Sequence, residues 1–392
     1  MDLNQLTQAG TFCALPFVHQ EKNMQGQHNI CCYSNEKQFD TPDQNSFDSF
    51  NSSTMNSIRT QMLNGLKPKQ CASCYQLEDQ GIRSPRLSET NVWLNSTGYL
   101  ESIKLKRNIQ FFQQNRPITP ISYDLRYSNT CTLKCRMCNS GSSSSINQEY
   151  SKLTAKWPDK FWTVDNPRIN HAVEITEDIT KVYLAGGEPL VEPLNLALLN
   201  QLADVNPEVN LVINTSLNHL SDRFLTILNR FQHLTLAVSL DGTAAVNDYI
   251  RSGSDFATVT ENIKQVMHHY LMFGSCISIY NIFNVPDLVQ FVIDNYPTAT
   301  DNHGINIVGG IDELALDNVP VKLRPMLIEQ LTAALDIAGA QARPGIQNLI
   351  VTLEQDNFDQ ARFERFKRYT TILDQNRNQS VGAVVPELAE YF

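Results

Sequence analysis

Three cysteines in the middle of the 392-residue chain lie close enough in sequence to bind one metal cluster. They are Cys131, Cys135 and Cys138, with the spacing Cys-x3-Cys-x2-Cys. A loop of this length can point three thiolates at one face of an iron–sulfur cube, and cysteine loops are the usual way in which proteins hold such clusters. One iron of the cube then has no protein ligand, and this open position can bind and activate a small molecule. The spacing therefore predicts iron–sulfur chemistry.

The cysteine loop, with the bulky Met137 before its third cysteine, resembles the cluster motif of radical S-adenosylmethionine (radical SAM) enzymes. The resemblance implies that Cys131, Cys135 and Cys138 hold a 4Fe–4S cluster whose open iron is chelated by the amino and carboxylate groups of SAM. It also implies that one electron breaks a carbon–sulfur bond of SAM, and that the resulting 5′-deoxyadenosyl radical removes a hydrogen atom from the substrate. An electron donor such as flavodoxin or ferredoxin is implied as well. The protein must position and shield this cofactor.

A second motif, Gly186-Gly187-Glu188-Pro189, directly follows a predicted strand. It resembles the GGEP motif of the same family, which receives the amino group of SAM. Glycines permit close approach of the backbone, and Glu188 adds a negative charge beside an ammonium group. Gly-Gly and Pro are also ordinary turn residues. The motif gains its significance from the cysteine loop, which follows the preceding strand.

Four further residues are assigned to SAM by the resemblance. Asn214 lies at the end of a predicted strand, where the family often contacts the ribose or methionine portion of SAM. Ser239 and Asp241 belong to a Ser-Leu-Asp-Gly stretch that resembles SPASM-type enzymes, and Arg251 ends an element like the family's Asp-x-x-Arg. A guanidinium can form paired hydrogen bonds to a carboxylate such as that of SAM. Alternatively, Ser239 caps a turn, Asp241 binds backbone amides and Arg251 is exposed.

The N-terminal part of the chain is rich in Asn, Gln and Ser and poor in periodic apolar runs, so we expect it to bury little core of its own. Metal coordination can stabilise such a unit. The pattern Cys13-x12-Gly26-x4-Cys31 resembles the opening of SPASM/Twitch modules, which hold auxiliary iron–sulfur clusters. The resemblance implies a Twitch-like auxiliary 4Fe–4S cluster with Cys13, Cys31, Cys71 and Cys74 as ligands. In the family this module usually follows the catalytic domain, whereas here it precedes it.

Two alternatives remain open for these N-terminal cysteines. Cys32 adjoins Cys31, and only the spacing favours Cys31 as the ligand. Four cysteines that include a Cys-x2-Cys pair also form structural zinc sites, and the nearby His19 and His28 would permit a mixed site.

Six predicted strands alternate with helical segments after this N-terminal part. The strands cover residues 121–125, 180–184, 211–214, 234–238, 277–282 and 304–308. Such alternation implies parallel pairing with right-handed crossovers. It fits an α/β fold, and with the family resemblance we expect a partial (β/α)6 barrel. Active groups of such barrels lie at the carboxyl ends of strands, and both motifs follow strands. Cys276 is predicted to be a buried core thiol that opens the fifth strand.

We therefore expect an auxiliary cluster module over residues 1–114, a radical SAM core over 115–312 and a C-terminal helical extension over 313–392. Within the extension, one helix is predicted over 323–340, with a break at Arg343-Pro344-Gly345. A second is predicted over 351–374. Its aromatic residues recur at helical spacing, which is typical of a helix that packs against the core.

Composition narrows the function further. The net charge of −10 disfavours nucleic acid as a partner, because domains that hold its backbone are usually basic. The sequence contains no apolar stretch of about 18 residues, so we expect no membrane span. Residues 1–5 lack the basic start of a signal peptide. Nine cysteines, an odd number, favour metal binding over disulfides and predict a reducing cytoplasm.

The sequence thus predicts a radical SAM enzyme of the oxidoreductase or maturase type that modifies a peptide or a small molecule. The SPASM-type resemblance favours a peptide. Radical abstraction needs no acid or base, so no catalytic side chain is predicted. The alternatives are a metal-stabilised binding protein that does not turn over SAM, and a small-molecule dehydrogenase of the same superfamily.

Overall fold

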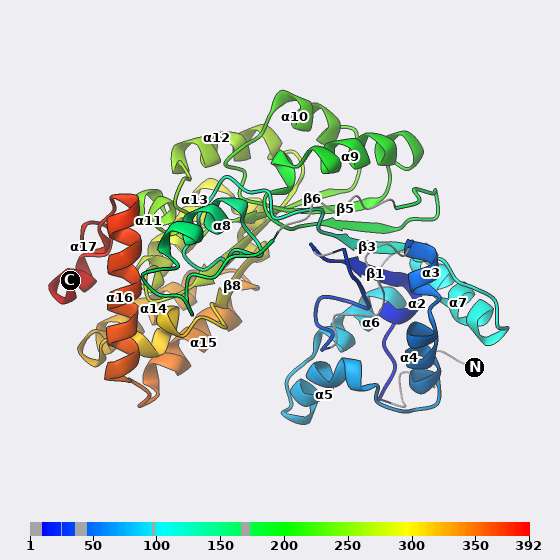
Figure 1. Cartoon of the computed structure of the whole chain (residues 1–392), viewed down its shortest axis with the longest axis horizontal. Helices are drawn as coiled ribbons and strands as arrows, with labels where there is room; N and C mark the ends of the chain where they lie inside the picture. Colours follow the sequence, from blue (N-terminus) through cyan, green and yellow to red (C-terminus); the bar gives the residue numbers. More distant parts are fainter. Residues whose placement is uncertain (1–9, 25, 36–44, 96–98, 166–172) are drawn as a thin grey trace. The chain divides into compact units, whose positions relative to one another are not determined.

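The computed structural model describes residues 10–24, 26–35, 45–95, 99–165 and 173–392 (Figure 1). The expectation about a signal peptide concerns residues 1–5, which lie outside this part. The chain forms two compact units. The first unit comprises Met1–Asn129, Asp165–Val212 and Thr226–His233. The second unit comprises Thr130–Val164, Ile213–Leu225 and Leu234–Phe392.

The first unit contains four strands in the order β2-β1-β3-β4. Their bounds are β1 His19–Lys22, β2 His28–Asn29, β3 Ser122–Leu125 and β4 Lys181–Leu184. Strands β1, β3 and β4 are parallel, and β2 is antiparallel to β1. The strands predicted over 121–125 and 180–184 are thus confirmed. The sequence did not predict β1, because its residues His-Gln-Glu-Lys carry no apolar alternation although most of them are buried.

Short helices surround the hydrophobic core of the first unit. They are α2 Leu15–Val18, α3 Ser46–Phe50, α4 Ser53–Leu63, η1 Lys69–Cys71, α5 Ala72–Asp79, α6 Pro85–Asn95, α7 Tyr99–Gln113, η2 Pro189–Val191 and α9 Pro193–Val205. The core includes Phe17, Phe50, Ile58, Trp93 and Leu105, all of them buried. The expectation that the N-terminal part buries little core is therefore wrong. Each short helix contributes only a few apolar residues, so the core left no periodic signal in the sequence.

Two elements continue from one unit into the other along the chain. Strand β5 (Asn210–Thr215) begins in the first unit and ends in the second. Helix α10 (Asp222–Leu228) begins in the second unit and ends in the first. The strand predicted over 211–214 is confirmed as β5.

The second unit contains the parallel strands β6 (Leu234–Ser239), β7 (Tyr270–Ile277) and β8 (His303–Ile307), in this order. The strands predicted over 234–238 and 304–308 are confirmed. The fifth predicted strand is misplaced, because β7 ends at Ile277, where the prediction began. Gly274 and Ser275 interrupt the apolar pattern of β7 and hid it. Cys276 lies near the end of β7 and is exposed, so the prediction of a buried thiol is wrong.

Helices alternate with these strands and complete the second unit. They are α8 Ser144–Leu153, α11 Ala244–Ile250, α12 Phe256–Val266, η3 Ile282–Asn284, α13 Val285–Asn295, η4 Pro297–Asn302, η5 Asp312–Leu314, η6 Leu316–Asn318, η7 Val321–Leu323, α14 Arg324–Ile337, α15 Ala342–Glu354, α16 Gln360–Arg377, α17 Val381–Val384 and η8 Pro386–Tyr391. The prediction of an α/β fold with parallel strands is confirmed. In the described ranges, every helix is too short or too polar to cross a membrane. The three-part division at 114 and 312 stays a prediction about function.

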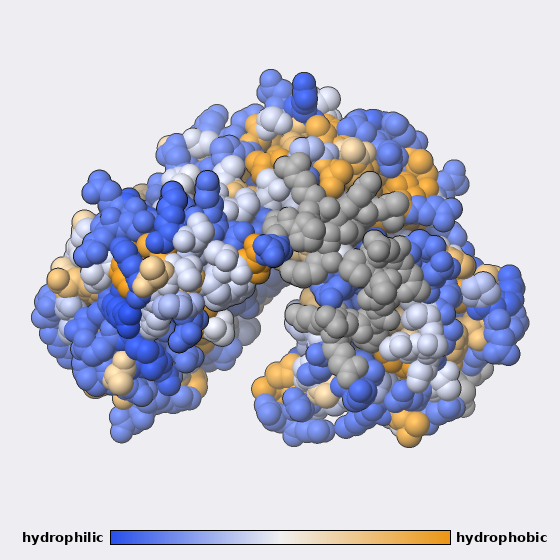
Figure 2. All heavy atoms as spheres, viewed as in Figure 1, coloured by the Kyte–Doolittle hydropathy of each residue, from blue (hydrophilic) through white to orange (hydrophobic). Residues whose placement is uncertain are grey.

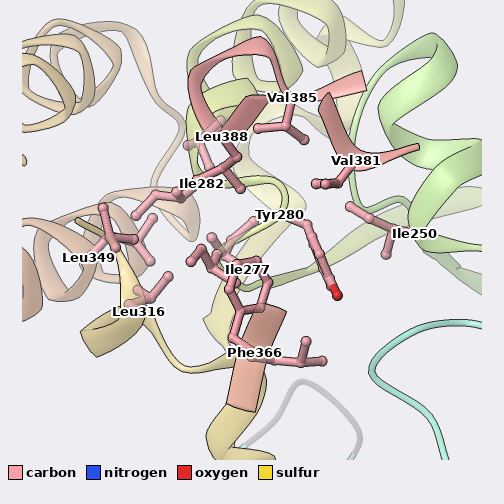
Figure 3. Packing of buried hydrophobic residues seen from close by; sticks show 14 of the residues in the cluster. Ile250, Ile277, Tyr280, Ile282, Leu316, Leu349, Phe366, Val381, Val385 and Leu388 are labelled. Atoms are coloured by element: carbon pink, nitrogen blue, oxygen red, sulfur yellow. The ribbon is translucent and has the colours of Figure 1, made fainter. Parts of the chain in front are cut away.

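The C-terminal helices differ from the prediction in two ways. The stretch 343–345 lies in the first turn of α15 and does not interrupt helical structure, since Pro344 is tolerated in a first turn. The helix predicted over 351–374 is instead divided between α15 and α16. The predicted core packing is confirmed, because Phe363, Phe366 and Tyr369 of α16 are buried. Phe366 lies beside Tyr280 (Figure 3), and the centroids of the two rings are 5.4 Å apart.

Candidate metal and cofactor sites

The cysteine loop of the second unit, residues 130–143, lies between β3 and α8. Its backbone pairs with the stretch after α11: Lys134 N donates to the Ser252 carbonyl at 2.8 Å, and Arg136 N donates to the Ile250 carbonyl at 2.8 Å. Gly253 has a φ of 99°, and a Cβ atom there would lie 3.3 Å from the Thr132 carbonyl oxygen. Neighbouring backbone therefore holds the loop along much of its length.

The three thiols of the loop are partly exposed, and the charges of two of them act on the third. Burial raises the pKa of Cys138 to about 12, and the charges of Cys135 and Cys131 contribute to the increase. Across the described ranges, no three His, Cys, Asp or Glu side chains stand in the geometry of a bound metal ion. The chemistry of the donor set nevertheless fits a cluster, because three soft thiolates come from one loop.

An arginine stands beside the middle thiol of the loop. Arg251 Nη1 lies 3.9 Å from Cys135 Sγ, and its Nε lies 2.7 Å from Asp241 Oδ2. Burial raises the pKa of Cys135, whereas the Arg251 charge opposes that increase. A cation here would offset the negative charge of a thiolate-bound cluster.

Asp241 is fully buried, and its second carboxylate oxygen accepts a hydrogen bond from Cys276 N at 2.7 Å. Both carboxylate oxygens of Asp241 therefore have partners within the protein, and one of these partners is Arg251. Its predicted contact with SAM stays a prediction, as does that of Arg251. Asn214 and Ser239 lie together near the ends of β5 and β6, with 3.4 Å between Ser239 Oγ and Asn214 Oδ1.

The Gly186–Pro189 motif belongs to the first unit and follows β4. Gly186 has a φ of 119°, and a Cβ atom there would lie 2.8 Å from the Ser128 carbonyl oxygen. Gly187 N donates to the same oxygen at 3.1 Å. Glu188 is buried and accepts a hydrogen bond from Leu190 N at 3.2 Å, while Pro189 begins η2. The tight turn thus requires glycine and places a buried carboxylate directly after it.

The four predicted auxiliary ligands also lie near one another, although they come from distant parts of the first unit. Burial raises the pKa of Cys13, and the charges of Cys71 and Cys74 raise it further. Burial likewise raises the pKa of Cys31, to which the charge of Cys13 adds. Cys71 ends η1 and Cys74 lies in the first turn of α5. A set of four thiols supplies the ligands of either a 4Fe–4S cluster or a zinc ion.

Cys31 and Cys32 differ in the charges that act on them. Besides burial, the main influences on the pKa of Cys32 are the carboxylates of Asp124 and Glu21, which raise it. For Cys31, the charge of Cys13 follows burial as the next influence that raises the pKa. The imidazole Nδ1 of His19 lies 2.8 Å from Ser122 Oγ.

Sequence reasoning missed Arg86, a cation beside the auxiliary thiols. Its Nη1 donates at 2.5 Å to the carbonyl of Phe12, the residue that precedes Cys13. Its Nη2 lies 2.5 Å from Glu78 Oε2. The Arg86 charge opposes the burial-induced increase in the pKa of Cys13 and Cys71. The position of Arg86 in the sequence did not indicate its contact with the Phe12 carbonyl.

Sequence reasoning also missed Arg136, which lies inside the cysteine motif. Its guanidinium is buried and forms an ion pair with Asp374, far along the chain. A charged residue between two motif cysteines was the only available signal.

Comparison with known proteins supports the prediction that was drawn from the cysteine loop. Residues 125–287 match the family model described as the Radical SAM superfamily. The prediction of a radical SAM domain is therefore confirmed for this part of the chain. The family implies SAM and a 4Fe–4S cluster as cofactors. No curated protein matches the sequence.

Several solved structures are similar to the chain. The crystal structure of Streptococcus suis SuiB bound to S-adenosylmethionine has 16% identity and a TM-score of 0.38, covering 72% of this chain and 61% of that chain. Native anSMEcpe with bound AdoMet has 14% identity and a TM-score of 0.36, covering 55% and 60%. SuiB bound to precursor peptide SuiA has 14% identity and a TM-score of 0.34, covering 81% and 64%. The chain thus spans about three fifths of the length of these structures.

Proposed function

We propose that this protein is a radical SAM enzyme that modifies a peptide with the help of an auxiliary 4Fe–4S cluster. The observation that carries the proposal is the group of three neighbouring thiols on one loop, with Arg251 beside Cys135, inside the segment that matches the family model. When bound, the cluster and SAM together supply a 5′-deoxyadenosyl radical that removes a hydrogen atom from the substrate.

The residues of the chain bind and orient this cofactor. Cys131, Cys135 and Cys138 hold the cluster, and Arg251 offsets its charge. Asp241 fixes the guanidinium of Arg251 at 2.7 Å. The resemblance assigns the SAM amino group to the stretch that begins at Gly186, where glycine permits close approach of the backbone.

The auxiliary cluster is proposed on the four thiols of the first unit. Cys13, Cys31, Cys71 and Cys74 would occupy one ligand position on each iron of a 4Fe–4S cube. Since no iron is then open to the substrate, we assign this cluster the role of electron acceptor. The Arg86 charge beside Cys13 and Cys71 supports such a role, because a cation favours the reduced, more negative form of a cluster.

The peptide substrate is the finer part of the proposal. It rests on the Ser-Leu-Asp-Gly stretch and on the N-terminal cysteines, which resemble those of SPASM-type enzymes. A small-molecule substrate is the alternative within the same chemistry, and both are served by an external electron donor such as flavodoxin or ferredoxin.

The test is the release of 5′-deoxyadenosine by anaerobically reconstituted protein. The protein receives SAM and a strong reductant, together with either a host peptide fraction or a small-metabolite fraction. We expect about eight irons per chain, as two cubes, and release that the peptide fraction stimulates. Stimulation by metabolites alone would replace the peptide substrate. Roughly four irons with one zinc would remove the auxiliary cluster from the proposal. Absence of release with both clusters loaded would indicate a binding protein.

A further inference from the structure

Helix α16 of the C-terminal extension is joined to the cysteine loop through Arg136. This arginine lies between the second and third cysteines, and its side chain is 1% exposed. Its Nη2 lies 2.5 Å from Asp374 Oδ1 of α16 and 3.0 Å from Gln379 Oε1. Its Nε donates to the Tyr249 carbonyl at 3.1 Å. The guanidinium is therefore held in one orientation by partners on both sides.

The carboxylate of Asp374 accepts hydrogen bonds from two further groups besides Arg136. Its Oδ1 accepts from Tyr249 Oη at 2.9 Å in addition to Arg136, and its Oδ2 accepts from Val381 N at 2.8 Å. From the same helix, Tyr369 Oη donates to the Arg136 carbonyl at 3.1 Å. Helix α16 thus fixes both the side chain and the backbone of Arg136.

A second contact joins α16 to the residue before Cys135. Lys134 Nζ lies 3.3 Å from Glu149 Oε1 of α8. Arg377, in the last turn of α16, binds the same carboxylate with its Nε at 3.0 Å from Oε1 and its Nη2 at 2.6 Å from Oε2. Asn376 Nδ2 donates to Glu149 Oε1 at 2.9 Å. Both Glu149 and Arg377 are buried.

These two contacts bracket Cys135, because Lys134 precedes it and Arg136 follows it. Helix α16 therefore contacts the loop directly at Arg136 and, through Glu149 of α8, at Lys134. The solvent side of α16, the long red helix of Figure 1, carries the exposed Glu364, Arg365 and Arg368, and hydrophilic residues predominate over it in Figure 2. The buried ionic groups face the loop, where an unmatched charge is costly.

We propose that Asp374 and Arg377 are positioning residues that hold the cysteine loop in the geometry required for SAM binding. The inference rests on the proposed function. It assigns to the C-terminal extension a role in the chemistry of the loop, since a small displacement of a bound reactant is enough to reduce its reactivity. A merely structural role would lower the stability of the protein and leave the interaction between cluster and SAM unchanged.

The test compares Asp374→Asn with Arg362→Gln in the reconstituted full-length protein. Arg362 lies on the same helix, and its Nη1 is 2.7 Å from Asp317 Oδ2 of η6, so this control breaks an ion pair of α16 that does not involve the loop. The measurement is the SAM-dependent change in the EPR spectrum of the reduced cluster, titrated with SAM, together with iron content and thermal stability.

We expect Asp374→Asn to require about tenfold more SAM for half of the spectral change, the size of effect that outer-shell residues of metal sites commonly have. Arg362→Gln should titrate like the unmodified protein. Asp374→Glu, which keeps the charge, should recover part of the loss. Equal SAM titrations for Asp374→Asn and Arg362→Gln would overturn the proposal.

Glu149→Gln provides a second variant if Asp374→Asn does not fold. It removes the carboxylate charge to which both Lys134 and Arg377 bind, and it should shift the SAM titration in the same direction. An unshifted titration would overturn the proposal. The unmodified protein separates the two hypotheses. If its EPR spectrum does not respond to SAM, the proposed function fails. If it responds and the α16 variants respond equally, only the positioning role fails.

Discussion

The two groups of cysteines in this protein differ in the number of thiols, in the stretches of sequence that supply them and in their exposure. The cysteine loop of the second unit takes three thiols from one short stretch, and these thiols remain partly exposed. The first unit assembles four thiols from separate stretches, and two of them, Cys13 and Cys74, are buried. Each group has an arginine nearby, Arg251 in one and Arg86 in the other. A set of three leaves room for a small molecule, whereas a set of four closes the metal site.

The difference in design also implies a difference in dependence on the fold. The loop is in contact with its backbone partners and with α16, so the cluster proposed there would be needed for chemistry and not for the local fold. Three thiols of the first unit, Cys13, Cys31 and Cys71, pack against a hydrophobic core, so the proposed auxiliary cluster would join segments that are distant in sequence. Loss of one cysteine should therefore affect the two units in different ways.

The largest expected effect is the loss of catalysis in Cys135→Ala. Removing the middle ligand should abolish 5′-deoxyadenosine release and lower the iron content from about eight to about four per chain. The fold should persist, because the loop is held by backbone hydrogen bonds that the substitution leaves in place. Release and iron are measured together on one preparation, and release at the unmodified rate would exclude this loop as the SAM site.

The matched experiment in the first unit compares Cys13→Ala with Cys32→Ala. Cys13→Ala should lose about four irons per chain and unfold at a lower temperature, because Cys13 lies among the other three thiols and the core. Cys32→Ala should keep its iron, since the charges that raise the pKa of Cys32 most are the carboxylates of Asp124 and Glu21 and not other thiols. Iron analysis and thermal unfolding report both effects. Loss of iron from Cys32→Ala but not from a Cys31→Ala variant would reverse the ligand assignment.

Asp241→Asn tests the arginine beside the loop. Asp241 is fully buried, so the substitution leaves the Arg251 guanidinium without its counter-charge. Loss of one partner of a buried ion pair typically costs about 3–5 kcal/mol, and we expect a decrease near the lower limit because Arg251 retains some exposure. Urea unfolding measures the decrease. An unchanged free energy of unfolding would show that the pair does not stabilise the fold.

Gly186→Ala should destabilise the first unit by about 1–3 kcal/mol, the cost of a strained backbone conformation. A Cβ atom at this position meets the Ser128 carbonyl oxygen at 2.8 Å. Gly309→Ala is the matched control, since no atom lies within 4 Å of a Cβ atom built there. Chemical unfolding of both variants should show a loss only for Gly186→Ala, and equal losses would contradict the role of the tight turn.

The smallest effect concerns the arginine beside the auxiliary thiols. Arg86→Gln removes a positive charge near Cys13 and Cys71 and should lower the midpoint potential of the auxiliary cluster by on the order of 50 mV. The physical reason is that a cation stabilises the reduced form. Potentiometric titration followed by EPR measures the shift, with the SAM-responsive cluster of the same sample as an internal control. A shift confined to the SAM-responsive cluster would contradict the placement of Arg86 beside the auxiliary cluster.

The predictability of the fold depended on how each strand is stabilised. Strand β6 was predicted because the apolar Leu234, Leu236 and Val238 recur at every second position, and all three are buried in the structure. Strand β1 carries no such alternation, and its extended form is supported by pairing with β3. Strand β7 was displaced in the prediction because Gly274 and Ser275 weaken its apolar pattern. Tertiary pairing thus decided the strands that local hydrophobicity did not.

For the candidate sites, the sequence by itself determined the cysteine loop and the radical SAM domain, because the spacing of ligands on one loop is a local property. Only the tertiary structure decided which residues surround them. Arg136 meets Asp374 across 238 positions of the sequence, and Arg86 meets the Phe12 carbonyl across 74. Such contacts leave no trace in spacing, because they depend on how separate helices and loops pack. For the same reason, the charges that act on Cys31 and on its neighbour Cys32 differ in a way that spacing does not indicate.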